Sequence, residues 1–258
     1  MHAPHLVVVE NPDAVAHAAV RLFVSAAIRA IDAKGSFSVA LAGGSTPKAM
    51  FELLARGEPS DVPTPPQWPF DWANVHVYFG DERCVPPDHP ESNFGMANDT
   101  LLSKVPIPAS NIHRMRGEID PNEAAKEYGQ LLKQQFGDGG LDLTLLGMGD
   151  DGHTASLFPY TPALKETHHR CVAHFVEKST TGKSWRITLT APFINRSSEV
   201  LIAVTGAKKS AVLNEVLNGP RDPDRLPIQL IQPSGQLVWL LDEPAAARCK
   251  RQGDKETR

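Results

Sequence analysis

The sequence predicts an α/β protein with a mainly parallel sheet that is covered by helices on both faces. Short apolar runs of strand length alternate with segments of helical periodicity along the whole chain. Several of these runs end in glycine and polar residues, the composition expected where a strand turns into a helix. No internal repeat or low-complexity tract interrupts the alternation, and a length of 258 residues suits one large core. We therefore expect residues 1–258 to form a single domain.

Helix boundaries are the clearest local signals in the first half of the chain. Asn11-Pro12 supplies an N-cap and a proline at the first helical position, and Gly35 ends the helix that follows. Asp120-Pro121 repeats this start. The expected strands of this half are residues 6–9, 37–42 and 75–79, and the expected helices are residues 12–34, 48–56, 93–103 and 121–136.

The second half continues the alternation after a buried strand at residues 141–146. Its other expected strands are residues 186–190, 200–205 and 237–241, with a helical connection at 192–197, a helix from about 206 to 217 and a last helix after 241. Two segments are expected to be irregular. Residues 57–73 hold five prolines and form an exposed loop, and the charged tail, about 250–258, frays.

Composition and charge exclude several classes of protein. A formal net charge of −4 gives no reason to expect nucleic-acid or membrane binding, and we expect no stretch of membrane-spanning length. The N-terminus has neither the basic start nor the long apolar core of a signal peptide. Three widely spaced cysteines without a CxxC pair argue against disulfides and zinc, and they fit a cytoplasmic protein. His168-His169 is expected to be a solvated pair, because adjacent side chains point apart.

The strand at 141–146 runs directly into a loop that concentrates chemistry. Three glycines allow a tight turn, and the loop carries Asp150, Asp151 and His153, then Thr154 and Ser156. Open α/β sheets bind ligands at the carboxyl ends of their strands, so this position favours a functional site. The alternative is an Asx-turn with a helix cap and a surface histidine.

A second chemical feature is the turn after residues 37–42. Gly43-Gly44-Ser45-Thr46 leads into a helix with Pro47 expected at its first position. Backbone N–H groups and two hydroxyls at the positive end of a helix favour phosphate binding. An ordinary capped turn is equally compatible, because the sequence is neither a Walker loop nor G-x-G-x-x-G.

Two further strand ends carry positive charge. Asp81 and Arg83 follow the strand at 75–79 and share a face if the chain stays extended, and Arg83 offers a forked contact to an anion. Taken alone, this segment is more typical of a solvated ion-pair cluster. Lys209 begins a helix after the strand at 200–205, where it is either an anion ligand or an exposed helix-start lysine.

Taken together, these motifs resemble the 6-phosphogluconolactonase family, which shares a Rossmann-like fold with the glucosamine-6-phosphate deaminases. The resemblance covers nearly the whole chain, and the stretch 151–159 is highly specific to the lactonase branch. The matching segments are residues 42–47, 81–83 with 93–96, 147–159, 186–190, 205–209 and 238–243.

The resemblance implies cofactor-free hydrolysis of 6-phospho-D-glucono-1,5-lactone to 6-phosphogluconate in the oxidative pentose phosphate pathway. It implies His153 as the general base, which suits a group that titrates near neutral pH. Asp151 would orient the ring or stabilise the imidazolium. The substrate phosphate would bind at Gly43, Gly44, Ser45 and Thr46 with Asp81, Arg83 and Lys209 nearby, and Arg186 is a candidate donor to the oxyanion. Asp150 receives no role.

We expect a phosphorylated sugar lactone as the ligand, no metal, no nucleic-acid or membrane partner, and a monomer or weak homodimer. The nearest rival is a sugar-phosphate deaminase on the same fold, but the glutamate of its Asp-Gly-His motif is replaced by Phe158. A sugar-phosphate sensor would add a DNA-binding segment, and the sequence has no basic helical extension. A metallo-hydrolase is disfavoured because no histidine pair stands at ligand spacing.

Overall fold

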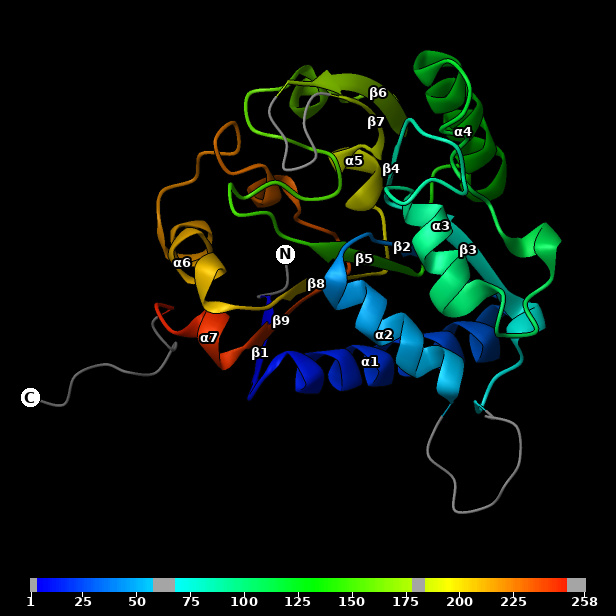
Figure 1. Cartoon of the computed structure of the whole chain (residues 1–258), viewed down its shortest axis with the longest axis horizontal. Helices are drawn as coiled ribbons and strands as arrows, with labels where there is room; N and C mark the ends of the chain where they lie inside the picture. Colours follow the sequence, from blue (N-terminus) through cyan, green and yellow to red (C-terminus); the bar gives the residue numbers. More distant parts are fainter. Residues whose placement is uncertain (1–3, 58–67, 178–183, 250–258) are drawn as a thin grey trace, which may run out of the picture.

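The computed structural model describes residues 4–57, 68–177 and 184–249, and these residues build two sheets (Figure 1). The larger sheet has six strands, all parallel, in the order β1-β9-β8-β5-β2-β3. This confirms the predicted α/β class. Its strands are β1 (His5–Val9), β2 (Phe37–Leu41), β3 (Val75–Phe79), β5 (Leu143–Gly147), β8 (Glu199–Val204) and β9 (Gln236–Asp242).

Helices lie on both sides of this sheet. Figure 1 shows α1 (Pro12–Lys34) and α2 (Ser45–Arg56) on one side, with α4 (Pro121–Phe136) and α5 (Ala191–Ile194) on the other. Central strands are covered on both faces, and all five residues of β2 are buried. The shorter helices are α3 (Asn93–Ala97), which continues as a π-helical turn (Asn98–Leu102), α6 (Ser210–Asn218) and α7 (Glu243–Ala246).

The predicted helix starts at Pro12 and Pro121 are confirmed, and two others need a correction. The helix expected from about residue 206 begins at Ser210, after a 3-10 turn at Ala207–Lys209. The Asn11 side chain accepts a hydrogen bond from the Ala14 N–H at 2.9 Å, and Gly35 ends α1 with a φ of 79°. The start of α2 was expected at Pro47 but lies at Ser45. Pro47 is still tolerated, because the first four N–H groups of a helix have no helical partner.

The expectation that no stretch reaches membrane-spanning length is wrong for α1. By length and composition alone, this helix is long and apolar enough to cross a bilayer. Half of the qualifying window is buried inside the protein, and α1 contacts α2, β2, β8 and β9. A core helix of a soluble protein passes the same test, so the helix is weak support for a membrane role.

The second sheet is the main feature that the sequence analysis missed. It is antiparallel and has three strands in the order β4-β7-β6: β4 (Asp81–Arg83), β7 (Ser184–Leu189) and β6 (Cys171–Val176). The expected strand at 186–190 therefore belongs to this sheet and not to the parallel one, and β6 was not predicted. Helix α4 packs against β6 and β7, which buries the sheet on that side.

The proline-rich segment also needs a correction. The predicted tail, 250–258, and residues 58–67 of the predicted loop lie outside the described residues. Trp72, at the end of the predicted loop, is only 5% exposed, so the exposed loop ends before this residue. The Trp68 Nε1–H donates to the Leu54 carbonyl at 2.9 Å, and Phe70 and Trp72 pack near Phe23. This aromatic cluster anchors the segment to α1 and α2. His168 and His169 are exposed, as predicted.

A buried carboxylate fixes the turn that follows β8. Asp242 at the end of β9 is fully buried and accepts the Gly206 N–H with both oxygens, at 3.0 and 2.9 Å, and the Ala245 N–H at 2.7 Å. Gly206 has a φ of 93°, a left-handed conformation that favours glycine. Asp242 therefore holds the turn that leads to Lys209 and caps α7.

Replacing Asp242 with alanine should destabilise the protein by about 2–4 kcal/mol, because it leaves the Gly206 and Ala245 N–H groups without their acceptor. Urea unfolding monitored by circular dichroism measures the change. Asp242→Asn, which keeps one acceptor oxygen, should cost less. A loss below about 0.5 kcal/mol for the alanine variant, the range of ordinary surface substitutions, would contradict the anchoring role.

Candidate active site

A cavity of about 250 Å³ opens where the carboxyl ends of several strands meet. Its walls come from the turn after β2, from β4, from the start of α3, from the loop after β5 and from the turn after β8. This is the position at which open α/β sheets bind ligands. The lining residues are Ala42, Gly43, Gly44, Asp81, Arg83, Asn93, Gly147, Met148, Gly149, Asp150, His153, Thr154, Ala155 and Lys209.

Six of the ten predicted site residues line this one cavity: Gly43, Gly44, Asp81, Arg83, His153 and Lys209. Asp151 contacts His153 directly. Ser45 is exposed at the start of α2, and the Thr46 hydroxyl is hydrogen-bonded to that of Thr205 at 3.0 Å. Arg186 is only 3% exposed and does not line the cavity.

His153 and Asp151 form a close pair. The His153 Nδ1 lies 2.6 Å from the Asp151 Oδ1, and the same oxygen accepts the His153 backbone N–H at 3.1 Å. A carboxylate only accepts hydrogen bonds, so Nδ1 carries the proton of the neutral ring. No described residue hydrogen-bonds the Nε2, which leaves that nitrogen able to accept a proton from a ligand or a water molecule.

Packing fixes the plane of the His153 ring. Phe158 stacks on it with the ring centroids 4.2 Å apart and an interplanar angle of 26°. A Cβ added at Gly149 would lie 2.0 Å from the His153 Nδ1, which no side chain tolerates. Phe158 and Gly149 together allow one orientation of the imidazole beside Asp151.

The environment of Asp151 keeps its carboxyl ionised. Partial burial raises the pKa, but the hydrogen bond and the charge of His153 outweigh it, so the pKa of Asp151 is lowered from its ordinary value of 3.8. The carboxylate therefore persists to a lower pH than in a free aspartate. It is available to stabilise a positive charge on His153 throughout the neutral range.

The solvated ion-pair cluster predicted from residues 81–83 taken alone does not form. These residues form β4, and Asp81 and Glu82 are only 8% and 2% exposed. Glu82 accepts the backbone N–H groups of Asn93, Phe94 and Arg83 at 2.7–2.8 Å. Burial raises the pKa of Glu82 despite these bonds. Its role is to hold the start of α3.

Asn93 was missed as a site residue, although it lies in a segment that carries the family resemblance. Its amide nitrogen donates to the Asp81 carbonyl at 2.9 Å and to the Asp81 Oδ1 at 3.2 Å. A Cβ at Gly43 would lie 2.0 Å from the Asn93 Oδ1, so the turn after β2 needs glycine at this point. Gly44 has a φ of 102°, which also favours glycine.

Two arginines face each other across β4 and β7. Arg83 is the register partner of Arg186, and its guanidinium donates to the Glu91 carbonyl. Burial, followed by the charge of Arg83, lowers the pKa of Arg186. Arg186 also donates to the Ser184 hydroxyl. Two arginines at directly opposed positions repel each other, and the nearby carboxylates of Asp81 and Glu91 oppose that effect on Arg186.

Lys209 reaches the cavity from the turn after β8. Its ammonium lies 2.6 Å from the Asp150 Oδ1, and both residues line the cavity. Asp150, which received no role from the sequence, is the ion-pair partner of Lys209. The role of Lys209 as an anion ligand stays a prediction.

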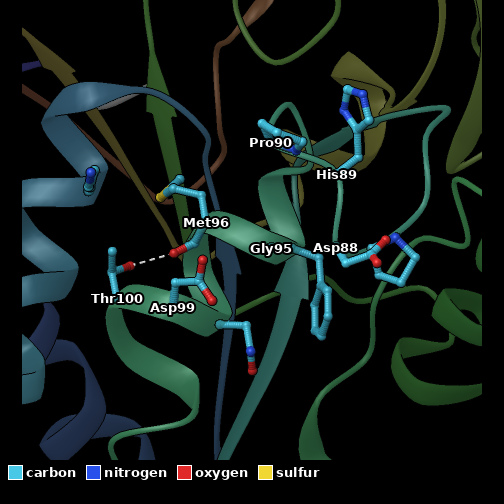
Figure 2. A pocket seen from close by; sticks show the side chains of 11 residues that line it. Asp88, His89, Pro90, Gly95, Met96, Asp99 and Thr100 are labelled. Carbon is cyan, nitrogen blue, oxygen red and sulfur yellow. Dashed lines mark hydrogen bonds between the residues drawn. The ribbon is translucent and has the colours of Figure 1, made fainter.

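A separate cavity of about 490 Å³ lies between α3, the π-helical turn and the loop before α3. Figure 2 shows His89 and Pro90 on one side of it and Asp99 and Thr100 on another. None of the predicted site residues lines this second cavity. In residues 4–57, 68–177 and 184–249, no group of three or more His, Cys, Asp or Glu side chains is placed to hold a metal ion.

The fold and the cavity define an α/β protein with a candidate ligand site at the carboxyl ends of parallel strands. The family model described as glucosamine-6-phosphate isomerases/6-phosphogluconolactonase matches residues 10–239. The chain belongs to this family, which confirms the resemblance.

Two named relatives are similar to this chain over most of their own length. A protein of Synechocystis sp. named 6-phosphogluconolactonase is 39% identical over 249 residues, covering 94% of this chain and 97% of its own length. A human protein of the same name is 39% identical over 218 residues, or 83% of this chain and 81% of its own.

Solved structures agree with this placement. The 6-phosphogluconolactonase from Trypanosoma brucei superposes with a TM-score of 0.83 at 28% identity, covering 97% of this chain and 100% of that one. A monomeric glucosamine-6-phosphate deaminase superposes with a TM-score of 0.80 over 95% of this chain and 99% of its own, at 21% identity. The deaminase comparison shows a shared fold only.

Replacing His153 with alanine should raise the pKa of the Asp151 carboxyl from its lowered value, because the substitution removes the side-chain hydrogen bond and the charge of His153 while burial and the backbone hydrogen bonds remain. Titration of the Asp151 carboxyl ¹³C signal by NMR measures the shift. An Asp151 pKa that stays as low as in the unaltered protein would show that another group holds the carboxylate ionised.

Proposed function

We propose that this protein hydrolyses 6-phospho-D-glucono-1,5-lactone to 6-phosphogluconate, with His153 as the general base. The observation that carries the proposal is that the His153–Asp151 pair opens on the same cavity as a glycine turn, Arg83 and Lys209. A base and an anion site in one small cavity suit a substrate with both a reactive carbonyl and a phosphate. The names of the relatives support the same reaction.

The hydrolytic step follows from the His153 geometry. The Nε2 takes a proton from water as the water oxygen attacks the lactone carbonyl carbon. Asp151 stabilises the imidazolium that forms, through its contact with the Nδ1–H. The tetrahedral intermediate then collapses, the bond to the ring oxygen breaks, and the proton passes from His153 to that oxygen. Water is consumed, and no cofactor or metal is required.

The phosphate would bind where Arg83, Lys209 and the turn after β2 line the cavity. Arg83 and Lys209 supply positive charge, and the Gly43–Gly44 turn supplies backbone N–H groups beside the N-terminus of α2. Binding energy from the substrate phosphate, which takes no part in the reaction, positions the lactone for attack. Ser45, Thr46, Asp81 and Arg186 remain predicted members of the substrate site.

The competing deaminase reaction is less well supported by this site. The family resemblance places a catalytic glutamate of the deaminases at the position of Phe158. In this protein Phe158 stacks on His153 and is 7% exposed, so the site has an apolar ring where that carboxylate would act. This favours a lactone over an amino-sugar phosphate.

The proposal extends to the setting of the reaction. The product, 6-phosphogluconate, belongs to the oxidative pentose phosphate pathway. Cys84, Cys171 and Cys249 are free thiols, which fits the reducing cytoplasm. A monomer or weak homodimer without nucleic-acid or membrane partners remains our expectation.

The direct test is the loss of lactone near neutral pH. Glucose-6-phosphate dehydrogenase generates the lactone in place, and its disappearance is followed against a blank without the protein. A blank is needed because the lactone also hydrolyses spontaneously. Acceleration supports the proposal, whereas a rate equal to the blank would refute it, and glucosamine 6-phosphate would be the next substrate to assay.

Replacing His153 with alanine should lower kcat by about two to four orders of magnitude, because the variant has no base at the water. Affinity for 6-phosphogluconate, measured by isothermal titration calorimetry, should change little. His168→Ala, which removes an exposed histidine outside the cavity, is the matched control. Near-normal turnover of the His153 variant would exclude it as the base.

Arg83→Ala and Lys209→Ala should each weaken the binding of 6-phosphogluconate by about ten- to a hundredfold, because each removes a charged donor to the phosphate. Calorimetry measures the affinity, and unphosphorylated gluconate serves as the control ligand. An unchanged affinity in either variant would remove that residue from the phosphate site.

A further inference from the structure

Asp150 and Lys209 form an ion pair inside the cavity. The Lys209 Nζ lies 2.6 Å from the Asp150 Oδ1, and the two side chains are 23% and 65% exposed. Neither the sequence pattern nor the reaction described above needs a carboxylate at Asp150. The catalytic contact to His153 comes from the neighbouring Asp151.

The pair connects two loops that are each also held by hydrogen bonds of their own. Asp150 follows β5 and Lys209 follows β8, and these strands are hydrogen-bonded neighbours in the parallel sheet. The Lys209 turn is held by the bonds from Gly206 to Asp242, and the Lys209 N–H donates to the Gly206 carbonyl at 3.0 Å. The loop after β5 is held by the Gly149 N–H donating to the His153 carbonyl at 2.8 Å and by the Thr154 hydroxyl donating to the Gly147 carbonyl at 2.8 Å.

The Asp150 carboxylate therefore has an effect that is mainly electrostatic. It occupies a donor that a phosphate would use, and it adds a negative charge to the wall of a cavity that receives an anion. A phosphorylated ligand must displace Asp150 from the Lys209 ammonium, or share that ammonium with it, and it also meets the repulsion of the carboxylate.

We propose that Asp150 is an affinity-setting residue: it competes with the substrate phosphate for Lys209 and so weakens the binding of phosphorylated ligands. The inference rests on the proposed function, because it takes Lys209 as a phosphate ligand. It predicts an effect on ligand affinity opposite to that of a residue that helps Lys209 bind the phosphate. Removing Asp150 should strengthen ligand binding, whereas removing a residue that only orients Lys209 should weaken it.

The Asp150→Asn variant tests the direction of the change in affinity, because it removes the charge with little change in side-chain shape. Its dissociation constant for 6-phosphogluconate, measured by isothermal titration calorimetry, should fall about two- to fivefold, the range for a solvent-accessible ion pair. The KM for the lactone should fall in the same direction. Both effects should shrink as salt is added, since the competition is electrostatic. Asp150→Glu, which restores the carboxylate, should bind as the unaltered protein does.

Two further variants separate electrostatic competition from other effects. Asp224→Asn removes the carboxylate of an exposed Lys165–Asp224 pair at 2.5 Å outside the cavity, with the same change in net charge, and should leave the affinity unchanged. In a Lys209→Ala background, Asp150→Asn should lose most of its effect, because the contested ammonium is gone.

The outcomes distinguish this proposal from the one on which it rests. Tighter binding in Asp150→Asn that disappears without Lys209 supports the competition. Unchanged or weaker binding in Asp150→Asn, while Lys209→Ala alone weakens binding, overturns the competition and leaves the phosphate site intact. If Lys209→Ala itself does not weaken binding, Lys209 is not a phosphate ligand, and the competition is overturned together with that part of the proposed site.

Discussion

The site depends on one buried residue, Ser156, which joins the loop after β5 to the antiparallel sheet. Its hydroxyl donates to the Asp81 Oδ2 at 2.7 Å, and its N–H donates to the Thr188 hydroxyl at 3.2 Å. Its carbonyl accepts from the His174 Nε2 at 2.6 Å. Three contacts from three strands thus fix a loop that carries His153 three residues earlier.

This junction explains why polar groups are buried at one end of the molecule. Burial lowers the pKa of His174, and the hydrogen bond to the Ser156 carbonyl opposes this shift only in part. The neutral ring therefore donates to the Ser156 carbonyl. Asp81 is bonded on its other side by Asn93, which also limits the turn at Gly43. Hydrogen bonds therefore join β4 to Ser156 in the loop that carries the base and to Asn93, which lies close against the glycine turn.

Much of the architecture could be predicted from local patterns. The apolar runs that became β2, β5 and β8 and the caps at Asn11 and Asp120 are encoded within a few residues of where they act. The loop with His153 was predictable for the same reason, because its glycines and polar side chains follow directly after β5.

The antiparallel sheet could not be predicted in this way. β4 has three residues, two of them carboxylates, and their burial depends on Asn93 and Ser156, which are 12 and 75 positions away. β7 pairs with β4 across about a hundred positions of sequence, and such pairings leave no periodic signal. The contact of Asp150 with Lys209 is equally non-local. In each case the missing information was a partner distant in the sequence.

The measurement that tests the account most directly is a comparison of kcat/KM for 6-phosphogluconolactone and for unphosphorylated gluconolactone. If one cavity holds the phosphate and aligns the carbonyl with His153, the phosphorylated lactone should be preferred on the order of a hundredfold or more. Equal values for the two lactones would contradict the account, because the glycine turn, Arg83 and Lys209 would then contribute nothing to catalysis.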